Sequence, residues 1–195
     1  MNNQVLGCQV NLLGNVVSKQ NTVRYFADGK AVLMLDLVVK KSWKTAQGEF
    51  KTHDTFVTVR VLDTLAEQLA KRVQAGDALF VQGRLGKYIE AVQCQWADKN
   101  KLFWNQVYCS GVVSQIERLK SVSDADYIKL LLQVEQLSLE VNLRGKTAEL
   151  MLDKLTEQQS LLVEGALGSK SVKTPQGYER QYWIDGHTCV NFDNS

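Results

Sequence analysis

The stretch "LAEQLAKRVQAGDALFVQGRL" (residues 65–85) is matched by "TAELMLDKLTEQQSLLVEGAL" (residues 147–167) at an offset of 82 residues and without a gap. Ala and Glu coincide near the start of both stretches, and Leu, Val, Gly and Leu coincide near the end. Apolar positions between them also match in character. A repeat of this length predicts two copies of one supersecondary unit, arranged in tandem along the chain.

Each copy has the pattern of a strand, a short helix and a second strand. Residues 56–61, "FVTVRV", alternate bulky and polar side chains with a period of two, which is typical of a strand. Leu65, Leu69 and Val73 follow at helical spacing. Residues 78–85, "ALFVQGRL", then return as a strand whose glycine marks a bend or a bulge.

Further apolar segments lie on both sides of this unit and complete a set of five strands. "VNLLGNVV" and "KAVLMLDLVV" precede it, and "YIEAVQCQW" follows it. Five strands with a helix between the third and the fourth give the order of an OB-fold barrel. We therefore predict an all-β chain with two tandem five-stranded OB-fold barrels, one short helix in each, in domains 1–106 and 107–195.

The two predicted domains differ in charge. Residues 1–106 hold 14 lysines and arginines against 9 acids, which gives +5, whereas residues 107–195 hold 9 against 12, which gives −3. The formal charge of the whole chain, +2, conceals this asymmetry. It predicts a polyanionic partner for the first domain and not for the second.

Several classes of protein are disfavoured by composition. The start "MNNQVLGCQV" is not that of a secretory signal, and no apolar run approaches the roughly 20 residues that span a bilayer. The four cysteines show no metal-ligand spacing, and "RGKT" (144–147) has Glu140 where a phosphate-binding loop needs glycine. We expect a cytoplasmic protein with no metal, no cofactor, no catalytic residues and no membrane contact.

The stretch "VVKKSWKTAQGEFKTHDTF" (residues 38–56) connects two of the expected strands and carries rings among lysines. A flat ring offers a sequence-tolerant surface on which a base stacks, worth about 1–3 kcal/mol per base, while lysines follow the phosphates. The alternatives are that Trp43 packs across its own hairpin and that the lysines form a solvated face. We interpret the hairpin as an arm that binds a single-stranded nucleic acid.

The order "VNLLGNVV…VRYFADGKAVLMLDLVVKKSW", then "LAE", then "VQGRL" resembles the bacterial single-stranded DNA-binding protein family over residues 9–119. The resemblance implies that single-stranded DNA wraps over the barrel face and its hairpins. It implies stacking roles for Trp43, Phe56 and Trp96, and it places Leu62 where the family has a fourth ring. The second half resembles the family through the repeat alone.

Two sets of candidate residues follow. The expected DNA-binding residues are Trp43, Phe56, Trp96, Lys40, Lys41, Lys44, Lys51, Phe50, Arg24, Tyr25, Arg84 and Lys87. Core packing is the alternative for Phe56 and Trp96, and both readings stay open for Tyr25 and Phe50. The second domain offers Tyr178, Tyr182, Trp183, Lys170, Lys173 and Arg180. Its net charge favours scaffolding, dimerisation or partner docking over DNA contact.

The predicted function is non-catalytic binding of single-stranded DNA in replication, recombination or DNA transfer. The alternative is an OB-fold adaptor of the replication-restart or recombination type that binds DNA weakly. RNA is a second candidate ligand, because stacking and phosphate contacts do not inspect the 2′-hydroxyl. We also expect a homodimer, a nucleoid-associated location, and replication or recombination proteins as further partners.

One departure from the family concerns the end of the sequence. Family members typically end in a flexible tail with an acidic tip that recruits repair and replication enzymes. This sequence stops at "CVNFDNS", directly after an expected strand. We therefore expect a tandem OB-fold variant without the acidic tail, such as a specialised copy from a mobile element.

Overall fold

A computed structural model describes residues 7–19, 23–44, 47–97, 102–120 and 126–191. The chain forms two compact units, each of which contains one barrel. The barrel-1 unit consists of residues 10–105 together with residues 169–180. The barrel-2 unit consists of residues 1–9, 106–168 and 181–195. The domain boundary after residue 106 stays a prediction.

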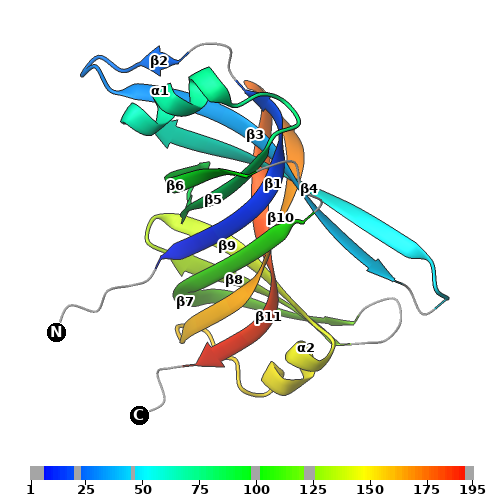
Figure 1. The fold of residues 1–195 in the computed structure, drawn as a ribbon. Helices are drawn as coiled ribbons and strands as arrows, with labels where there is room; N and C mark the ends of the chain where they lie inside the picture. Colours follow the sequence, from blue (N-terminus) through cyan, green and yellow to red (C-terminus); the bar gives the residue numbers. More distant parts are fainter. Residues whose placement is uncertain (1–6, 20–22, 45–46, 98–101, 121–125, 192–195) are drawn as a thin grey trace. The chain divides into compact units, whose positions relative to one another are not determined.

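The first barrel closes in the strand order β1–β5–β6–β4–β3, with β3 pairing back onto β1 (Figure 1). β4 and β6 run parallel, while β3 pairs antiparallel with both β1 and β4. The elements are β1 (Cys8–Lys19), β2 (Arg24–Tyr25), β3 (Ala31–Lys44), β4 (Phe50–Leu62), α1 (Asp63–Arg72), β5 (Ala78–Leu85) and β6 (Ile89–Ala97).

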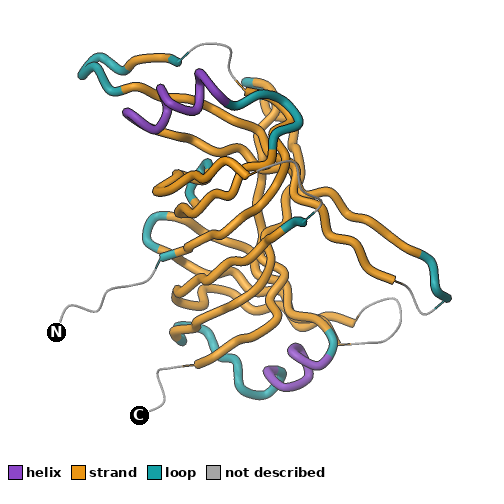
Figure 2. The backbone as a smooth tube through the Cα atoms, in the orientation of Figure 1, coloured by secondary structure: helices purple, strands orange, loops and turns teal. Residues whose placement is uncertain are grey.

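The second barrel repeats this topology. Its order is β7–β8–β9–β11–β10, with β10 pairing back onto β7 and with β9 parallel to β11. A short helix follows β4 in the first barrel and β9 in the second. Figure 2 shows the helices in purple. The elements are β7 (Trp104–Lys120), β8 (Asp126–Val134), β9 (Leu137–Arg144), α2 (Lys146–Met151), β10 (Ser160–Thr174) and β11 (Gly177–Asn191). Two tandem OB-fold barrels are confirmed.

Each barrel has its own core, built by the period-two alternation of its strands. Alternate residues are buried over 33–39 of β3 and 55–61 of β4, and likewise over 128–134 of β8 and 139–143 of β9 in the second barrel. The buried residues in these strands include Leu33, Leu35, Leu37, Val39, Val57, Val59, Val61, Ile128, Leu130, Leu132, Val134, Leu139, Val141 and Leu143. The side chains between them face outward, which leaves the outer surface of β3 and β4 for other contacts.

The repeat extends to the loop that follows each helix. Gly76 donates its backbone N–H to the carbonyl of Val16 at 2.7 Å, and Gln158 donates to Val113 at 2.8 Å. Both donors have left-handed backbones, with φ of +92° at Gly76 and +65° at Gln158. The second barrel therefore places a residue with a Cβ where the first has glycine, at a conformation that costs a non-glycine residue about 1–2 kcal/mol.

We expect Gln158→Gly to stabilise the chain by about 0.5–1 kcal/mol, because relief of the left-handed strain exceeds the extra backbone entropy of glycine. The urea midpoint of unfolding measures the change. Gln136→Gly is the matched control: Gln136 is also exposed but is not left-handed, so its replacement should destabilise slightly. Equal destabilisation by both variants would contradict the strain argument.

Candidate nucleic-acid interface

The hairpin of β3 and β4 continues beyond the barrel as a two-stranded arm, which we define as residues 40–54 (Figure 1). The pairing is continuous from Val32–Leu62 to Lys44–Phe50. Val39 and Thr55 are the last buried pair, and each arm residue whose burial is described is exposed. No core lies beneath the arm, so an outside partner can reach its side chains.

Between β8 and β9, whose backbone is fully described, the second barrel has no such arm. Its equivalent strands are joined by the two-residue turn Glu135–Gln136, which directly connects the paired residues Val134 and Leu137. Glu135 has a φ of +53°, as a tight hairpin turn requires. The hairpin is therefore shorter in the second repeat than in the first.

One face of the arm carries a ring and two lysines. Residues that lie opposite each other in an antiparallel pair share a face, so Phe50 shares a face with Lys44. Lys40 lies four residues before Lys44 in the same strand and therefore on the same face. The Lys44 ammonium lies 5.8 Å from the centre of the Phe50 ring. Phe50 is 78% exposed, so this ring is available to a base.

The other arm candidates lie on the alternate positions. Lys41 and Lys51 are both exposed, and Lys41 is paired with His53. The backbone of Trp43 lies in β3 and pairs with Lys51, while its side chain lies outside the described part of the structure. The stacking role of Trp43 therefore stays a prediction.

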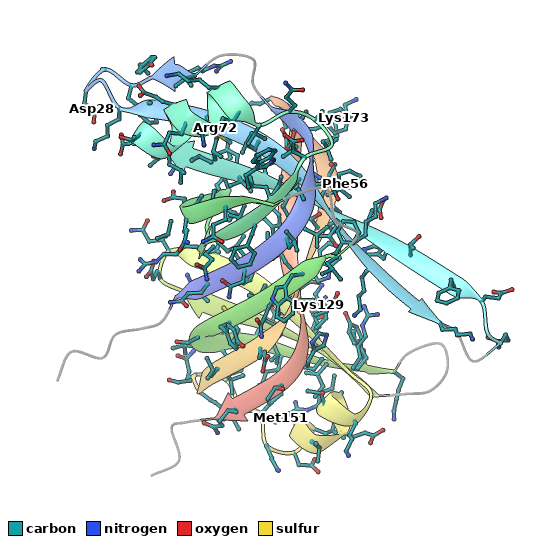
Figure 3. All side chains as sticks on the ribbon, in the orientation of Figure 1. Asp28, Phe56, Arg72, Lys129, Met151 and Lys173 are labelled. Carbon is teal, nitrogen blue, oxygen red and sulfur yellow. The ribbon has the colours of Figure 1, made fainter. Side chains whose placement is uncertain are left out.

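Phe56 lies at the base of the arm, where Figure 3 labels it. Its neighbours in sequence, Thr55 and Val57, are buried, whereas Phe56 points outward and is 38% exposed. The guanidinium of Arg180 lies over its ring, with Cζ 5.7 Å from the ring centre. The Ser169 hydroxyl donates to the Phe56 carbonyl at 2.5 Å. The ring is thus outside the core but partly covered.

Two tryptophans lie close together in sequence: Trp96 near the end of β6, and Trp104 at the start of β7. Trp96 is 57% exposed although it is paired with Leu79, which is fully buried, so Trp96 stands at the rim of the barrel. Trp104 is 52% exposed and also belongs to the barrel-1 unit. Sequence reasoning missed Trp104, although "KLFW" after a polar turn signals another ring close to the same hairpin.

Arg84 and Lys87 lie at the far end of β5 and in the following turn, and both are exposed. Lys87 donates to the Glu179 carboxylate at 2.9 Å, and this hydrogen bond raises the pKa of the lysine. Arg84 lies on the surface, and its contact with DNA stays a prediction. Lys87 is hydrogen-bonded to residues 169–180 of the same unit.

Arg24 and Tyr25 form the short strand β2, which pairs with Ala31 and Val32 at the start of β3. Both side chains are exposed. The Tyr25 hydroxyl donates to the Glu67 carboxylate of α1 at 3.2 Å. The negative charge of Glu67 raises the pKa of this hydroxyl. Tyr25 is therefore held against the helix and is less free to stack than Phe50.

Charge separates more sharply between the compact units than between the predicted domains. The barrel-1 unit carries 17 lysines and arginines against 10 acids, a net charge of +7. The barrel-2 unit carries 6 against 11, a net charge of −5. A net charge of this sign and size attracts a polyanion to the barrel-1 unit at long range.

Within the described ranges, no group of three or more histidine, cysteine or acidic side chains is placed to hold a metal ion. The same residues contain no helix that is long and apolar enough to cross a membrane.

The structure brings Phe50, Phe56, Lys40 and Lys44 onto one face of the β3–β4 hairpin. Contacts of these residues with DNA stay predictions.

The fold defines a class of protein, the tandem OB-fold proteins. The exposed strand face of an OB-fold is a known binding surface for oligonucleotides and oligosaccharides. Residues 8–101 match the model of the single-strand binding protein family. This part of the chain is therefore similar to that family.

The chain is also similar to individual known proteins. The single-stranded DNA-binding protein of Deinococcus radiodurans is 30% identical over 92 residues, a match that covers 47% of this chain and 28% of that protein's length. Two structures of the Thermus aquaticus single-stranded DNA binding protein, a deletion variant and the wild type, give TM-scores of 0.81 and 0.79. Both are 21% identical, cover 96% of this chain, and are themselves covered to 95% and 94%. They share the two-barrel fold.

Proposed function

We propose that the chain binds single-stranded DNA without catalysing a reaction. The observation that carries the proposal is the arm, which exposes a ring and lysines on a hairpin. The arm lies within the part of the chain that matches the model of the single-strand binding protein family. The described arm side chains are exposed, so they add little to the stability of the barrel. A ligand with flat bases and a charged backbone accounts for both residue types.

The mechanism is recognition by stacking and by charge. Bases stack on exposed rings such as Phe50, and phosphates lie against the ammonium groups of Lys40 and Lys44. Neither contact reads the edge of a base, so we expect little sequence dependence. A duplex hides its base faces and therefore offers the arm only its phosphates.

The test is a titration of intrinsic tryptophan fluorescence with dT oligomers of increasing length at two salt concentrations. We expect tight binding that weakens with salt and that a duplex competitor displaces poorly. A matched oligo-rU series measures the preference between DNA and RNA. Equal displacement by duplex and by dT under the same salt would contradict the proposal.

We expect Trp43→Ala to weaken dT binding by about 1–3 kcal/mol, the range for one stacked base, with little change in thermal stability. The reason is the position of Trp43 in the backbone of the arm, beyond the last buried pair of the hairpin. Leu150→Ala, which truncates an apolar side chain that is 57% exposed in the barrel-2 unit, is the control. A large loss of melting temperature with normal affinity would assign Trp43 to packing.

The assembly belongs to the same proposal. We infer a homodimer, since two chains with two barrels each supply four, and closed symmetric pairs are the commonest homo-oligomers. Light scattering should give about twice the chain mass of 21.9 kDa. A monomer at micromolar concentration would remove the dimer from the proposal and would favour the adaptor role.

The biological setting follows from the ligand. Single-stranded DNA is exposed during replication, recombination, repair and DNA transfer, so we place the chain there, including transfer of mobile elements. A cytoplasmic, nucleoid-associated location and contacts with replication or recombination proteins belong to this proposal. A saturated site much shorter than one barrel's surface, with weak binding, would favour the adaptor role instead.

A further inference from the structure

Residues 169–180, the distal hairpin, comprise the end of β10, the turn after it and the start of β11. They belong to the barrel-1 unit although they are part of the second repeat in the sequence. Three contacts hold this hairpin near the base of the arm. The Ser169 hydroxyl donates to the Phe56 carbonyl, Glu179 accepts from Lys87 at 2.9 Å, and Arg180 lies over the Phe56 ring.

The distal hairpin is basic and open to solvent. Its sequence, "SKSVKTPQGYER", holds Lys170, Lys173 and Arg180 against Glu179. Glu179 is already paired with Lys87, so its charge does not cancel the hairpin's own cations. Lys170 and Lys173 are exposed, the latter labelled in Figure 3, and the Tyr178 ring is 77% exposed.

The Arg180 guanidinium lies close to one carboxylate without being hydrogen-bonded to it. Asp36 lies 4.0 Å away, beyond hydrogen-bond length, and its carboxylate already accepts hydrogen bonds from Ser18 at 3.0 Å and Thr58 at 2.7 Å. The ring of Phe56 therefore supports a planar cation that is not locked into a bidentate ion pair.

Phe56 cannot stack a base on the side that Arg180 covers. A base inserted between ring and guanidinium needs about 7 Å, twice the contact distance of roughly 3.5 Å, and the present separation is 5.7 Å. The outer face of a guanidinium plane is itself a stacking surface for a base, and its N–H groups bind phosphate oxygens.

We propose that the distal hairpin is part of the DNA-binding surface of the first barrel. Arg180 takes the place of the covered face of Phe56, and Lys170, Lys173 and Tyr178 extend the path of the strand beyond it. This inference rests on the proposed function of the arm. It also separates the second repeat into an acidic barrel and a basic hairpin with a different role.

The experiment compares full-length variants in dT titrations over a series of salt concentrations. Lys170→Gln with Lys173→Gln should lower the log–log salt slope by about 1.4, at roughly 0.7 per phosphate. Lys146→Gln with Lys154→Gln removes the same charge from exposed positions of the barrel-2 unit and should leave the slope unchanged. Tyr178→Ala should weaken binding about 5- to 150-fold if its ring stacks a base.

Arg180 is tested by two replacements. Arg180→Gln should weaken binding about 5- to 150-fold and lower the slope by about 0.7, whereas Arg180→Lys should keep the slope and lose the stacking part. Tighter binding by Arg180→Gln would show that the guanidinium merely shields Phe56, and would overturn the proposal. If Arg180→Gln fails to fold, the exposed lysine pair and Tyr178 decide.

The outcomes separate this inference from the function on which it rests. Wild-type binding with no effect of the lysine pair and of Tyr178 would overturn the inference and leave the arm's function intact. Failure of the wild-type chain to bind dT oligomers would overturn the proposed function itself.

Discussion

Replacing residues 40–54 by the turn Glu-Gln should reduce the affinity for dT oligomers by more than about 100-fold and leave the barrel folded. The deletion removes two rings, Trp43 and Phe50, each worth about 1–3 kcal/mol if it stacks one base. It also removes Lys40, Lys41, Lys44 and Lys51, which should lower the log–log salt slope by about 3 at roughly 0.7 per phosphate.

The second barrel supplies the design of this variant. There the same two residues join Val134 to Leu137, the pair equivalent to Val39 and Thr55. The first barrel should accept the turn because the arm contributes no buried residue among those described. The melting temperature should therefore change little.

Two controls separate charge from stacking. A variant with the four arm lysines changed to glutamine keeps the rings and should show the lower slope with a smaller loss of affinity at high salt. Phe50→Ala with Trp43→Ala keeps the lysines and should show the wild-type slope with weaker binding at every salt concentration. Unchanged affinity of the deletion variant would show that DNA binds elsewhere.

The topology could be predicted from the sequence because local patterns and the repeat agree. Alternation along residues 56–61 and helical spacing along residues 65–73 specify each unit, and the matching stretch 147–167 repeats it. The shorter hairpin of the second barrel could also be predicted, because Gly14 and Gly83 lie 69 residues apart whereas the matching Gly111 and Gly165 lie 54 residues apart.

The composition of the candidate site could be predicted only in part. The exposed arm follows from lysines and rings between two strands, but the cover of Arg180 over Phe56 joins residues 124 positions apart in sequence. A linear division of the chain assigned the charges of residues 169–180 to the second domain. Long-range packing places them in the barrel-1 unit, and no local pattern carries that information.

Among the glycines of the first barrel, Gly83 should be the one whose replacement by alanine destabilises the fold most. A Cβ at Gly83 would lie 2.4 Å from the carbonyl oxygen of Glu90, a backbone atom of the neighbouring strand β6. The pairing shifts register between Gln82 and Gly83, so the bulge expected from the sequence is present at this point. Gly165 repeats the arrangement in the second barrel, at 2.3 Å from the Asp185 oxygen.

The expected loss is about 3 kcal/mol, the upper part of the range for overpacking, because the obstacle is backbone and cannot rotate away. Gly86→Ala is the matched control: the nearest atom to its Cβ would be the Tyr88 oxygen at 3.6 Å, an ordinary contact. The urea midpoint of unfolding measures both variants. A loss below about 0.5 kcal/mol at Gly83 would mean that β5 and β6 can separate without cost. Since β6 also carries Trp96, such freedom would remove the rigid support that a stacking ring at the rim requires.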